Sequence, residues 1–196
     1  MKLYFFRHLP TKNNLNNVFI GRLDLECDSE YISEHFASIR SRLNALSFDR
    51  VFCSPLKRAR SSADLFFPHS YFVDRRLIER DLGVWSNVSK QDIKDRFPEA
   101  FFSNGNLDFS YTPMEGEAFI EVLRRVASFI LDVVDNSRED DNIAIVTHNG
   151  IITSVKCLVN NSYSTEIIKY QPFMEEYVLE ITDELIERLE EFISSK

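Results

Sequence analysis

Residues 142–150 read NIAIVTHNG, a short apolar run that leads directly into polar residues and a glycine. The first six of them, Asn142–Thr147, are rich in β-branched side chains and bounded by polar residues, which predicts a buried strand. A helix should start close to His148, just beyond the end of this strand. A strand that passes straight into a helix is typical of α/β folds, in which helices cover a mainly parallel sheet.

Four further runs have the length and composition of strands, the last less clearly than the others: Lys2–Phe6, Asp49–Cys53, Ser70–Val73 and Glu176–Ile181. Between or after them, apolar residues recur at helical spacing, which predicts four helices: Ser29–Leu46, Ser54–Phe66, Glu117–Val134 and Asp183–Ile193. In the second of these helices, Ser54 is expected to be the N-cap and Pro55 the first helical residue. Strands that alternate with helices indicate an α/β fold.

The chain has 196 residues, of which 44% are hydrophobic and 28% charged, as in soluble globular proteins. This length fits a single domain that spans residues 1–196. The net charge of −8 argues against a general nucleic-acid-binding protein, and no stretch is long and apolar enough to cross a membrane. The cysteines are scattered and odd in number, so we expect reduced thiols and a cytoplasmic protein.

The stretch Phe97–Glu115 shows the weakest periodicity in the chain, and we expect a loop or lid there, within residues 85–115 (the lid segment). The segment is rich in aromatic residues. Six of them are candidates for an apolar entrance, although at least half are expected simply to pack: Trp85, Phe97, Phe101, Phe102, Phe109 and Tyr111. The tail helix has one apolar side, which either covers the core or forms a homodimer contact.

Polar motifs follow four of the predicted strands. They are Arg7-His8, the run Ser54–Arg60, the run Leu77–Gly83 and the run Thr147–Gly150. Each motif alone has an ordinary explanation, such as a loop histidine, a solvated basic helix face or a surface glutamate. Because ligands of open α/β sheets bind beyond the carboxyl ends of the strands, the four motifs together predict one shared site.

These residues supply what cleavage of a phosphate monoester needs. Arg7 and Arg58 can bind the dianionic phosphate through paired, charge-assisted hydrogen bonds. His8 can act as the nucleophile if its ring is neutral, and nearby arginines disfavour the charged ring. A protonated His148 can hydrogen-bond the phosphoryl oxygens, and Glu79 can give the leaving alkoxide a proton.

Four blocks of sequence, in order along the chain, resemble the histidine phosphatase superfamily, the phosphoglycerate-mutase-like enzymes: FFRHLPTKNN, CSPLKRARSSA, LIERDLGVW and IVTHNGIITSV. The resemblance implies a three-layer sandwich and chemistry without a metal or other cofactor. It also implies that His8 is phosphorylated and that Glu79 is the general acid and later the base. The remaining residues expected at the phosphate pocket are Arg7, Arg58, His148, Asn14, Thr11, Gly21 and Asn149.

The chain departs from the family pattern at three places. Leu9-Pro10 stands where glycine and often glutamate usually follow the nucleophile, which we expect to add bulk beside the pocket and to alter the substrate. Ala118 stands at a frequent serine, so one polar contact is expected to be missing. Asn87 stands at a frequent glycine, which should matter only to a loop.

The expected activity is hydrolysis of a small organic phosphate through a phosphohistidine. One alternative is phosphoryl transfer of the phosphoglycerate-mutase type. The mutase branch carries a longer, basic insertion before the second histidine, whereas this segment is short, acidic and aromatic, with few cations beyond Arg96. The other alternative is a catalytically weak binding or regulatory protein, which only the Leu9-Pro10 departure supports.

Overall fold

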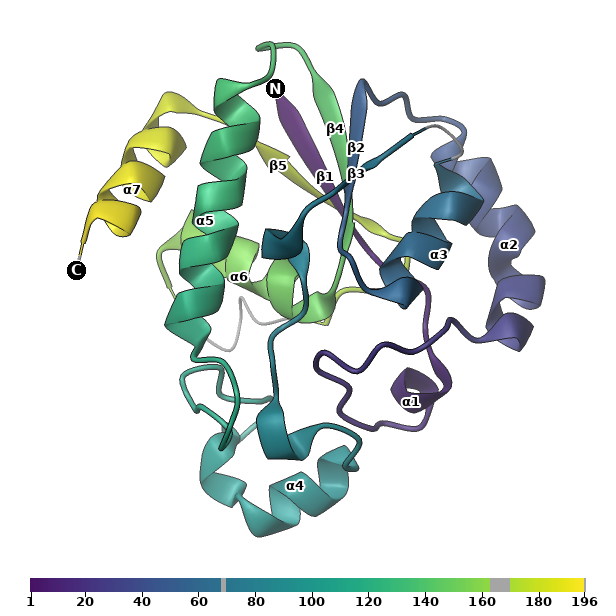
Figure 1. Cartoon of the computed structure of the whole chain (residues 1–196), viewed down its shortest axis with the longest axis vertical. Helices are drawn as coiled ribbons and strands as arrows, with labels where there is room; N and C mark the ends of the chain where they lie inside the picture. The colour runs from purple at the N-terminus through teal and green to yellow at the C-terminus, as the bar shows by residue number, and fades with distance from the viewer. Residues whose placement is uncertain (68–69, 163–169, 196) are drawn as a thin grey trace.

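The computed structural model describes residues 1–67, 70–162 and 170–195. His69, a histidine without an expected role at the site, lies outside these ranges. Within these ranges, five strands form one sheet in the order β3-β2-β4-β1-β5 (Figure 1). Four strands are mutually parallel and β5 is antiparallel to β1, which confirms the mainly parallel sheet. The strands are β1 (Lys2–Arg7), β2 (Arg50–Cys53), β3 (Phe72–Val73), β4 (Asn142–Thr147) and β5 (Glu176–Glu180).

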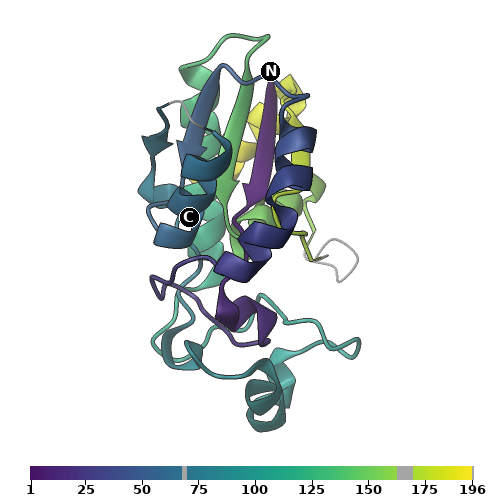
Figure 2. The same cartoon turned by 90° about the vertical axis from the view of Figure 1, so that its right-hand side faces the viewer.

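Helices cover both faces of this sheet. Helices α2 and α3 lie on one face, and α5, α6 and α7 lie on the other, which confirms the three-layer sandwich (Figure 1). The short helices α1 and α4 lie together beyond the carboxyl ends of the parallel strands (Figure 2). The α-helices are α1 (Lys12–Leu15), α2 (Ser29–Leu43), α3 (Lys57–Phe66), α4 (Lys90–Arg96), α5 (Phe119–Asp135), α6 (Asn149–Asn160) and α7 (Asp183–Ser194).

The central strands divide their side chains between two cores. Leu3 and Phe5 of β1 pack with Ile143 and Ile145 of β4 in the core beneath α5, α6 and α7. Phe6 points the other way, into the core beneath α2 and α3. Successive side chains of a strand point to opposite faces, so a strand with helices on both sides must be apolar throughout. This is why the run NIAIVT shows no alternation of apolar and polar residues.

Two predicted helices are three residues shorter at one end in the structure, and the other two differ by one or two residues. The helix expected from Ser54 begins at Lys57, and its N-cap, Leu56, makes no side-chain capping bond. The Ser54 hydroxyl is hydrogen-bonded to His148 Nε2 instead, at 2.7 Å. The helix expected to reach Leu46 ends at Leu43. Beyond this residue, the amides of Ala45 and Leu46 donate to carbonyls three residues earlier, as in a 3-10 turn.

The lid segment has a small core of its own. Buried Leu82, Trp85, Ile93 and Ala100 form it, and the Trp85 ring stacks on Tyr111 at 5.3 Å. Helix α4 lies within the segment and was not predicted, because seven residues give too few turns for a periodic pattern. After α4, the described lid residues form only one further helix, a 3-10 turn over Pro98–Ala100.

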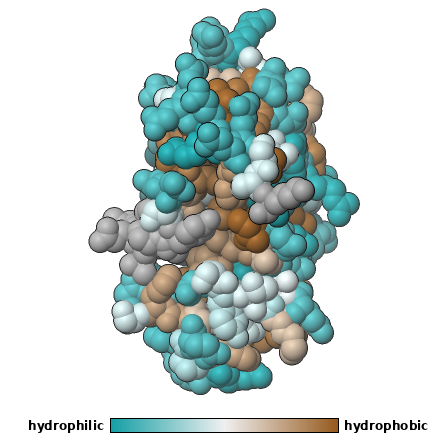
Figure 3. All heavy atoms as spheres, turned by 90° about the vertical axis from the view of Figure 1, so that its left-hand side faces the viewer, coloured by the Kyte–Doolittle hydropathy of each residue, from teal (hydrophilic) through white to brown (hydrophobic). Residues whose placement is uncertain are grey.

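The tail helix α7 covers the core of its own chain. Its Leu185 and Leu189 are buried beside α5, so the apolar side of the helix covers the core, which is one of the two roles expected for it. On the outer surface of the same side of the molecule, hydrophilic side chains cover most of the upper part, and apolar atoms show between them near the middle (Figure 3). In the described ranges, every helix is too short or too polar to cross a membrane.

Candidate active site

The carboxyl ends of three neighbouring strands bring together side chains that are far apart in the sequence. His8 follows β1, His148 follows β4, and Ser54 follows β2, which is the order of neighbours in the sheet. The two histidine rings have centroids 5.0 Å apart, and both residues are almost completely buried. The shared sheet edge therefore places His8 beside His148, as the strand-end motifs predict.

Two hydrogen bonds fix the protonation state of the His8 ring. Its Nδ1 lies 2.5 Å from the carbonyl oxygen of Leu9, which can only accept, so Nδ1 must carry the proton. Its Nε2 receives a hydrogen bond from Arg58 Nε at 3.1 Å, and that arginine nitrogen can only donate. The ring is thus neutral, with its lone pair on Nε2, which is the state that a nucleophilic histidine requires.

Arg58 sits on the first turn of α3 and is held by main-chain carbonyls. Its Nη1 donates to the oxygen of Leu23 at 2.6 Å, and its Nη2 donates to the oxygen of Gly21 at 2.8 Å. Gly21 therefore contributes its carbonyl to the site. These bonds aim the guanidinium at His8 across the strand ends, and burial lowers its pKa to about 10.

Arg7 is held by a segment near the end of the chain that sequence reasoning missed. Its guanidinium carbon lies 4.3 Å from the ring centroid of Tyr170 and 4.0 Å from that of Phe173. Its Nη1 donates to the carbonyl of Gln171 at 3.0 Å. Arginine packs favourably on aromatic faces, and the motif Tyr170-Gln171-Pro172-Phe173 was a signal for such packing.

Two buried nitrogen atoms at this site have no partner. Arg7 Nε and His148 Nδ1 both lack a hydrogen bond, and the described residues contain only one other such side-chain atom, Arg188 Nε. Unpaired buried donors are costly. If the Ser54 hydroxyl donates to His148 Nε2, the neutral His148 ring carries its proton on Nδ1. Both atoms are then donors without an acceptor, and the oxygens of a bound oxyanion are acceptors of the kind they lack.

Burial and neighbouring cations set the charge of both histidines. Burial lowers the pKa of His8 well below its ordinary value of 6.5, and the Arg58 and Arg7 guanidinium groups lower it further. The pKa of His148 is also well below the ordinary value, through burial first and then Arg58 and His8. Both rings are therefore neutral at pH 7 in the absence of an anion. A bound phosphate dianion would favour the protonated form of His148 that the sequence led us to expect.

Glu79 lies at the same site and is fixed by main-chain amides. The amide of Arg80 donates to its Oε1 at 2.8 Å, and the amide of Gly150 donates to its Oε2 at 3.2 Å. A Cβ atom at position 150 would lie only 2.3 Å from Glu79 Oε1. Any larger residue in place of the glycine of His148-Asn149-Gly150 would therefore displace this carboxylate.

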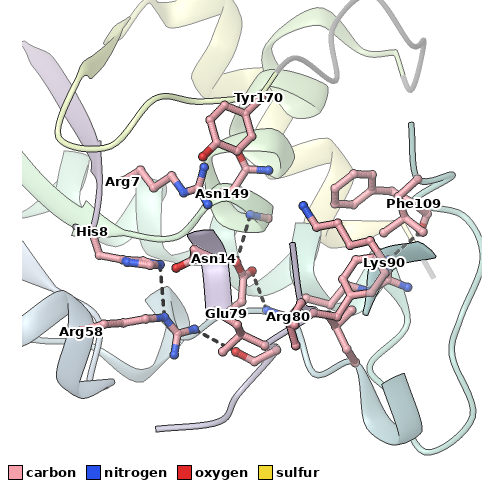
Figure 4. Close-up of a pocket in the computed structure, with 17 residues that line it drawn as sticks. Arg7, His8, Asn14, Arg58, Glu79, Arg80, Lys90, Phe109, Asn149 and Tyr170 are labelled. Atoms are coloured by element: carbon pink, nitrogen blue, oxygen red, sulfur yellow. Dashed lines mark hydrogen bonds between the residues drawn. The ribbon is translucent and has the colours of Figure 1, made fainter. Parts of the chain in front are cut away.

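These residues line one pocket, in which His8, Arg7 and Arg58 lie on one side, Lys90 on the opposite side and Glu79 between them (Figure 4). Lys90 extends from the start of α4 toward this cavity and was not predicted. Arg96, the cation noted in this part of the sequence, packs over Phe97 and is not among the lining residues. The pocket is lined by Arg7, His8, Asn14, Val18, Phe19, Ile20, Gly21, Arg58, Glu79, Arg80, Leu82, Lys90, Leu107, Phe109, Asn149, Gly150 and Tyr170.

The remaining predicted site residues have different places. Asn14 and Asn149 line the pocket, whereas His148 is fully buried and is not among the lining residues. Thr11 caps α1 and exchanges hydrogen bonds with Asn14, so its contact with the pocket is indirect. Of the six aromatic residues expected at an entrance, Phe109 alone is among the lining residues. Trp85 and the others pack in the cores, as expected for at least half of them.

The departures from the family pattern now have structural explanations. Leu9 is fully buried in the core beneath α2 and α3, and its amide donates to Ser62 Oγ, so the expectation of bulk beside the pocket was wrong. Asn87 has a φ of 66°, a conformation that explains a preference for glycine. Ala118 makes no side-chain cap, and its amide donates instead to Glu121.

Comparison with known proteins agrees with this geometry. Residues 3–184 match the model of the histidine phosphatase superfamily (branch 1). The chain is 27% identical to the adenosylcobalamin/alpha-ribazole phosphatase of Escherichia coli, over 78% of this chain and 76% of the relative. It is 23% identical to a 2,3-bisphosphoglycerate-dependent phosphoglycerate mutase of Azorhizobium caulinodans, over 85% of each chain.

Solved structures show the same fold. A mycobacterial glucosyl-3-phosphoglycerate phosphatase superposes with a TM-score of 0.77 at 21% identity, over 90% of this chain and 91% of that one. The Bacillus stearothermophilus protein YhfR superposes with a TM-score of 0.78 at 23% identity, over 93% and 92% of the two chains. The sequence blocks, the sheet order and the family match agree, and the chain belongs to the histidine phosphatase superfamily.

Proposed function

We propose that this protein is a phosphomonoester hydrolase that works through a phosphohistidine on His8. The observation that carries the proposal is the state of the His8 ring. Its proton is held on Nδ1 by a carbonyl. Its unprotonated Nε2 accepts a hydrogen bond from Arg58 Nε, and a phosphate oxygen can replace it as the acceptor. A neutral, oriented imidazole beside two arginines suits attack on a phosphate dianion.

In the first step, His8 Nε2 attacks phosphorus and the bond from phosphorus to the ester oxygen breaks. Arg7 and Arg58 hold the phosphoryl oxygens and stabilise the transferring group, and His148 Nδ1 donates to one of them. Glu79 in its acid form gives a proton to the departing oxygen, so the alcohol leaves neutral. Positioning and electrostatic stabilisation supply most of the rate in such transfers.

In the second step, water hydrolyses the phosphohistidine. The Glu79 carboxylate formed in the first step takes a proton from the water, whose oxygen attacks phosphorus as the bond to His8 Nε2 breaks. Inorganic phosphate leaves, His8 returns to its neutral state, and Glu79 is again protonated. One carboxyl group thus serves as acid and then as base.

The substrate we propose is a small organic phosphate. The pocket has arginines at one end, and Val18, Ile20, Leu107 and Phe109 give it an apolar wall. A pocket of mixed character fits an ester whose organic part lies away from the phosphate. Two similar proteins, the adenosylcobalamin/alpha-ribazole phosphatase and the glucosyl-3-phosphoglycerate phosphatase, are likewise named for phosphates of organic compounds.

The test is hydrolysis of p-nitrophenyl phosphate and of a set of alkyl phosphates without added metal. Wild type should release phosphate across neutral pH, and His8→Ala should lose the activity. Glu79→Gln should lose turnover of alkyl phosphates most, because their leaving groups need a proton. Equal inactivity of wild type and His8→Ala on every ester would contradict the proposal and favour a binding or regulatory role.

A second candidate is phosphoryl transfer of the mutase type, and Lys90 is the observation that favours it. This cation lies across the pocket from the arginines, where a second anionic group of a substrate could bind. A coupled assay with 3-phosphoglycerate and 2,3-bisphosphoglycerate separates the two candidates. Interconversion of phosphoglycerates faster than phosphate release would support the mutase, and phosphate release alone supports the hydrolase.

A further inference from the structure

We infer that Arg125 and Glu117 position the general acid Glu79 and thereby determine how well the enzyme cleaves esters with poor leaving groups. This inference rests on the proposed role of Glu79. Glu79 lies in an irregular segment after the 3-10 turn Arg75–Leu77, where no sheet ladder fixes the backbone. Side chains from elsewhere supply the bonds that hold this segment.

Arg125, in the middle of α5, holds the segment just before Glu79. Its Nη1 donates to the carbonyl of Arg76 at 2.5 Å and to the carbonyl of Ile78 at 2.6 Å. Its other nitrogens bind the Glu117 carboxylate with the parallel geometry of a bidentate pair, at 2.9 and 3.0 Å. One guanidinium therefore spans from helix α5 to the residue that precedes the acid.

Glu117 holds the segment just after Glu79. Its Oε2 accepts from the amide of Asp81 at 3.3 Å, and its own amide donates to the carbonyl of Asp81 at 3.0 Å. The same Oε2 lies 3.1 Å from Arg22 Nη2, and Arg22 Nε donates to the carbonyl of Glu79 itself at 3.1 Å. The backbone is thus held before, at and after the acid.

The Arg125–Glu117 pair is sheltered from water. The side chain of Arg125 is 15% exposed and that of Glu117 is 11% exposed. Ion pairs in this environment are weakly screened, and their geometry is tightly defined. Since a displacement of about 1 Å at a reacting group can cost about 100-fold in rate, a change in this pair should reach the chemistry at Glu79.

Lysine at position 125 keeps the charge but loses the planar fork. An ammonium group can bind Glu117 or the carbonyls, but it cannot make the same set of four contacts. The Arg125→Lys variant should therefore fold and bind phosphate while Glu79 is less well placed. The matched control is Arg124→Lys, because Arg124 is the neighbouring arginine of α5, is exposed and donates to the carbonyl of Ser195 at 3.3 Å.

The experiment measures kcat/KM for aryl and alkyl phosphates that differ in leaving-group pKa. This constant covers the steps through departure of the alcohol, so hydrolysis of the phosphohistidine does not enter. For Arg125→Lys we expect a loss of about 10-fold to 100-fold with alkyl phosphates and less than about 2-fold with p-nitrophenyl phosphate. The variant Glu117→Gln should show the same pattern, and Arg124→Lys should match wild type on every ester.

The outcomes separate the inference from the proposed function. An inactive wild type would contradict the proposed function. An active wild type with Arg125→Lys reduced equally on all esters would overturn the inference and leave a structural role only. Combining Arg125→Lys with Glu79→Gln should cost no more than Glu79→Gln alone, and additive losses would also overturn the inference. Thermal unfolding of each variant identifies a loss that comes from unfolding.

Discussion

The strand ends and the lid segment contribute to one pocket but are built in different ways. His8, Arg58 and His148 are attached to strands or to the first turn of a helix. Main-chain carbonyls fix His8 and Arg58, and the Ser54 hydroxyl holds His148. Lys90 comes from α4, a short helix that packs on a small core of its own. We infer that the strand-end half of the pocket, with His8 and Arg58, is rigid and binds the phosphate. The lid half, with Lys90, determines which ester fits.

Removing Arg58 tests the rigid half and should have the largest effect. We expect Arg58→Gln to lower kcat/KM about 1000-fold, because the transferring phosphoryl group loses a charged donor. The pKa of His8 should rise, because Arg58 is the cation that lowers it most. The acid limb of the pH profile of kcat/KM should therefore move to higher pH. A loss below about 10-fold would show that Arg58 is not part of the phosphate site.

Substituting Gly150 tests how closely the strand ends fit together. Gly150→Ala should displace the Glu79 carboxylate, because the new Cβ would lie 2.3 Å from Oε1. We expect kcat/KM for alkyl phosphates to fall about 10-fold to 100-fold. In a Glu79→Ala background the same substitution should have almost no further effect. A full additional loss in that background would mean that Gly150 acts on the helix and not on the carboxylate.

Substituting Lys90 tests the lid half. Lys90→Gln should raise KM about 10-fold for esters that carry a second anionic group and leave KM for p-nitrophenyl phosphate unchanged. The matched control is Lys94→Gln, an exposed lysine one turn along the same helix. An equal rise of KM for both kinds of ester would assign Lys90 to the phosphate site and remove the distinction between the two halves.

The pH dependence of stability tests the buried histidines at the strand ends. His8 and His148 have folded pKa values below 6.5, so below this pH the unfolded chain binds more protons than the folded one. Their contribution to stability is complete above pH 6.5 and is lost as the pH falls. Each should add a slope of up to about 1.4 kcal/mol per pH unit to the free energy of unfolding.

Urea unfolding between pH 5 and pH 7.5 measures this slope, with His8→Gln as the control that removes one histidine. The variant should lose stability less steeply with acid than wild type does. Identical slopes would show that His8 keeps an ordinary pKa in the folded protein. Other titrating groups contribute to both curves alike, so the difference between the two slopes reports the pKa of His8.

The sequence predicted the strand ends well for a physical reason. A strand covered on both faces must be apolar along its whole length, so NIAIVT stands out, and β4 has the predicted bounds. The polar residues that follow such strands are conspicuous by contrast. His8 and His148 could therefore be assigned to one edge of the sheet before their distance was known.

The lid half and the supporting contacts could not be predicted in this way. Helix α4 has seven residues, too few for a periodic signal, so Lys90 read as part of a surface loop. Ser54 looked like an N-cap, because Ser-Pro before a helix usually is one, and its contact with His148 depends on the sheet order. The burial of Leu9 depends likewise on helices that are distant in the sequence, because it packs in the core formed with α2 and α3.

The most direct test of the central claim is to trap the phosphoenzyme. The enzyme is mixed with a ³²P-labelled phosphate ester, and the reaction is stopped with alkali during turnover, because phosphohistidine survives base and is destroyed by acid. The labelled peptide is then identified. We predict label on the peptide that contains His8, stable in alkali and lost in acid, and no label in His8→Asn. Phosphate release by wild type without any labelled protein, or an equal label in His8→Asn, would contradict the account.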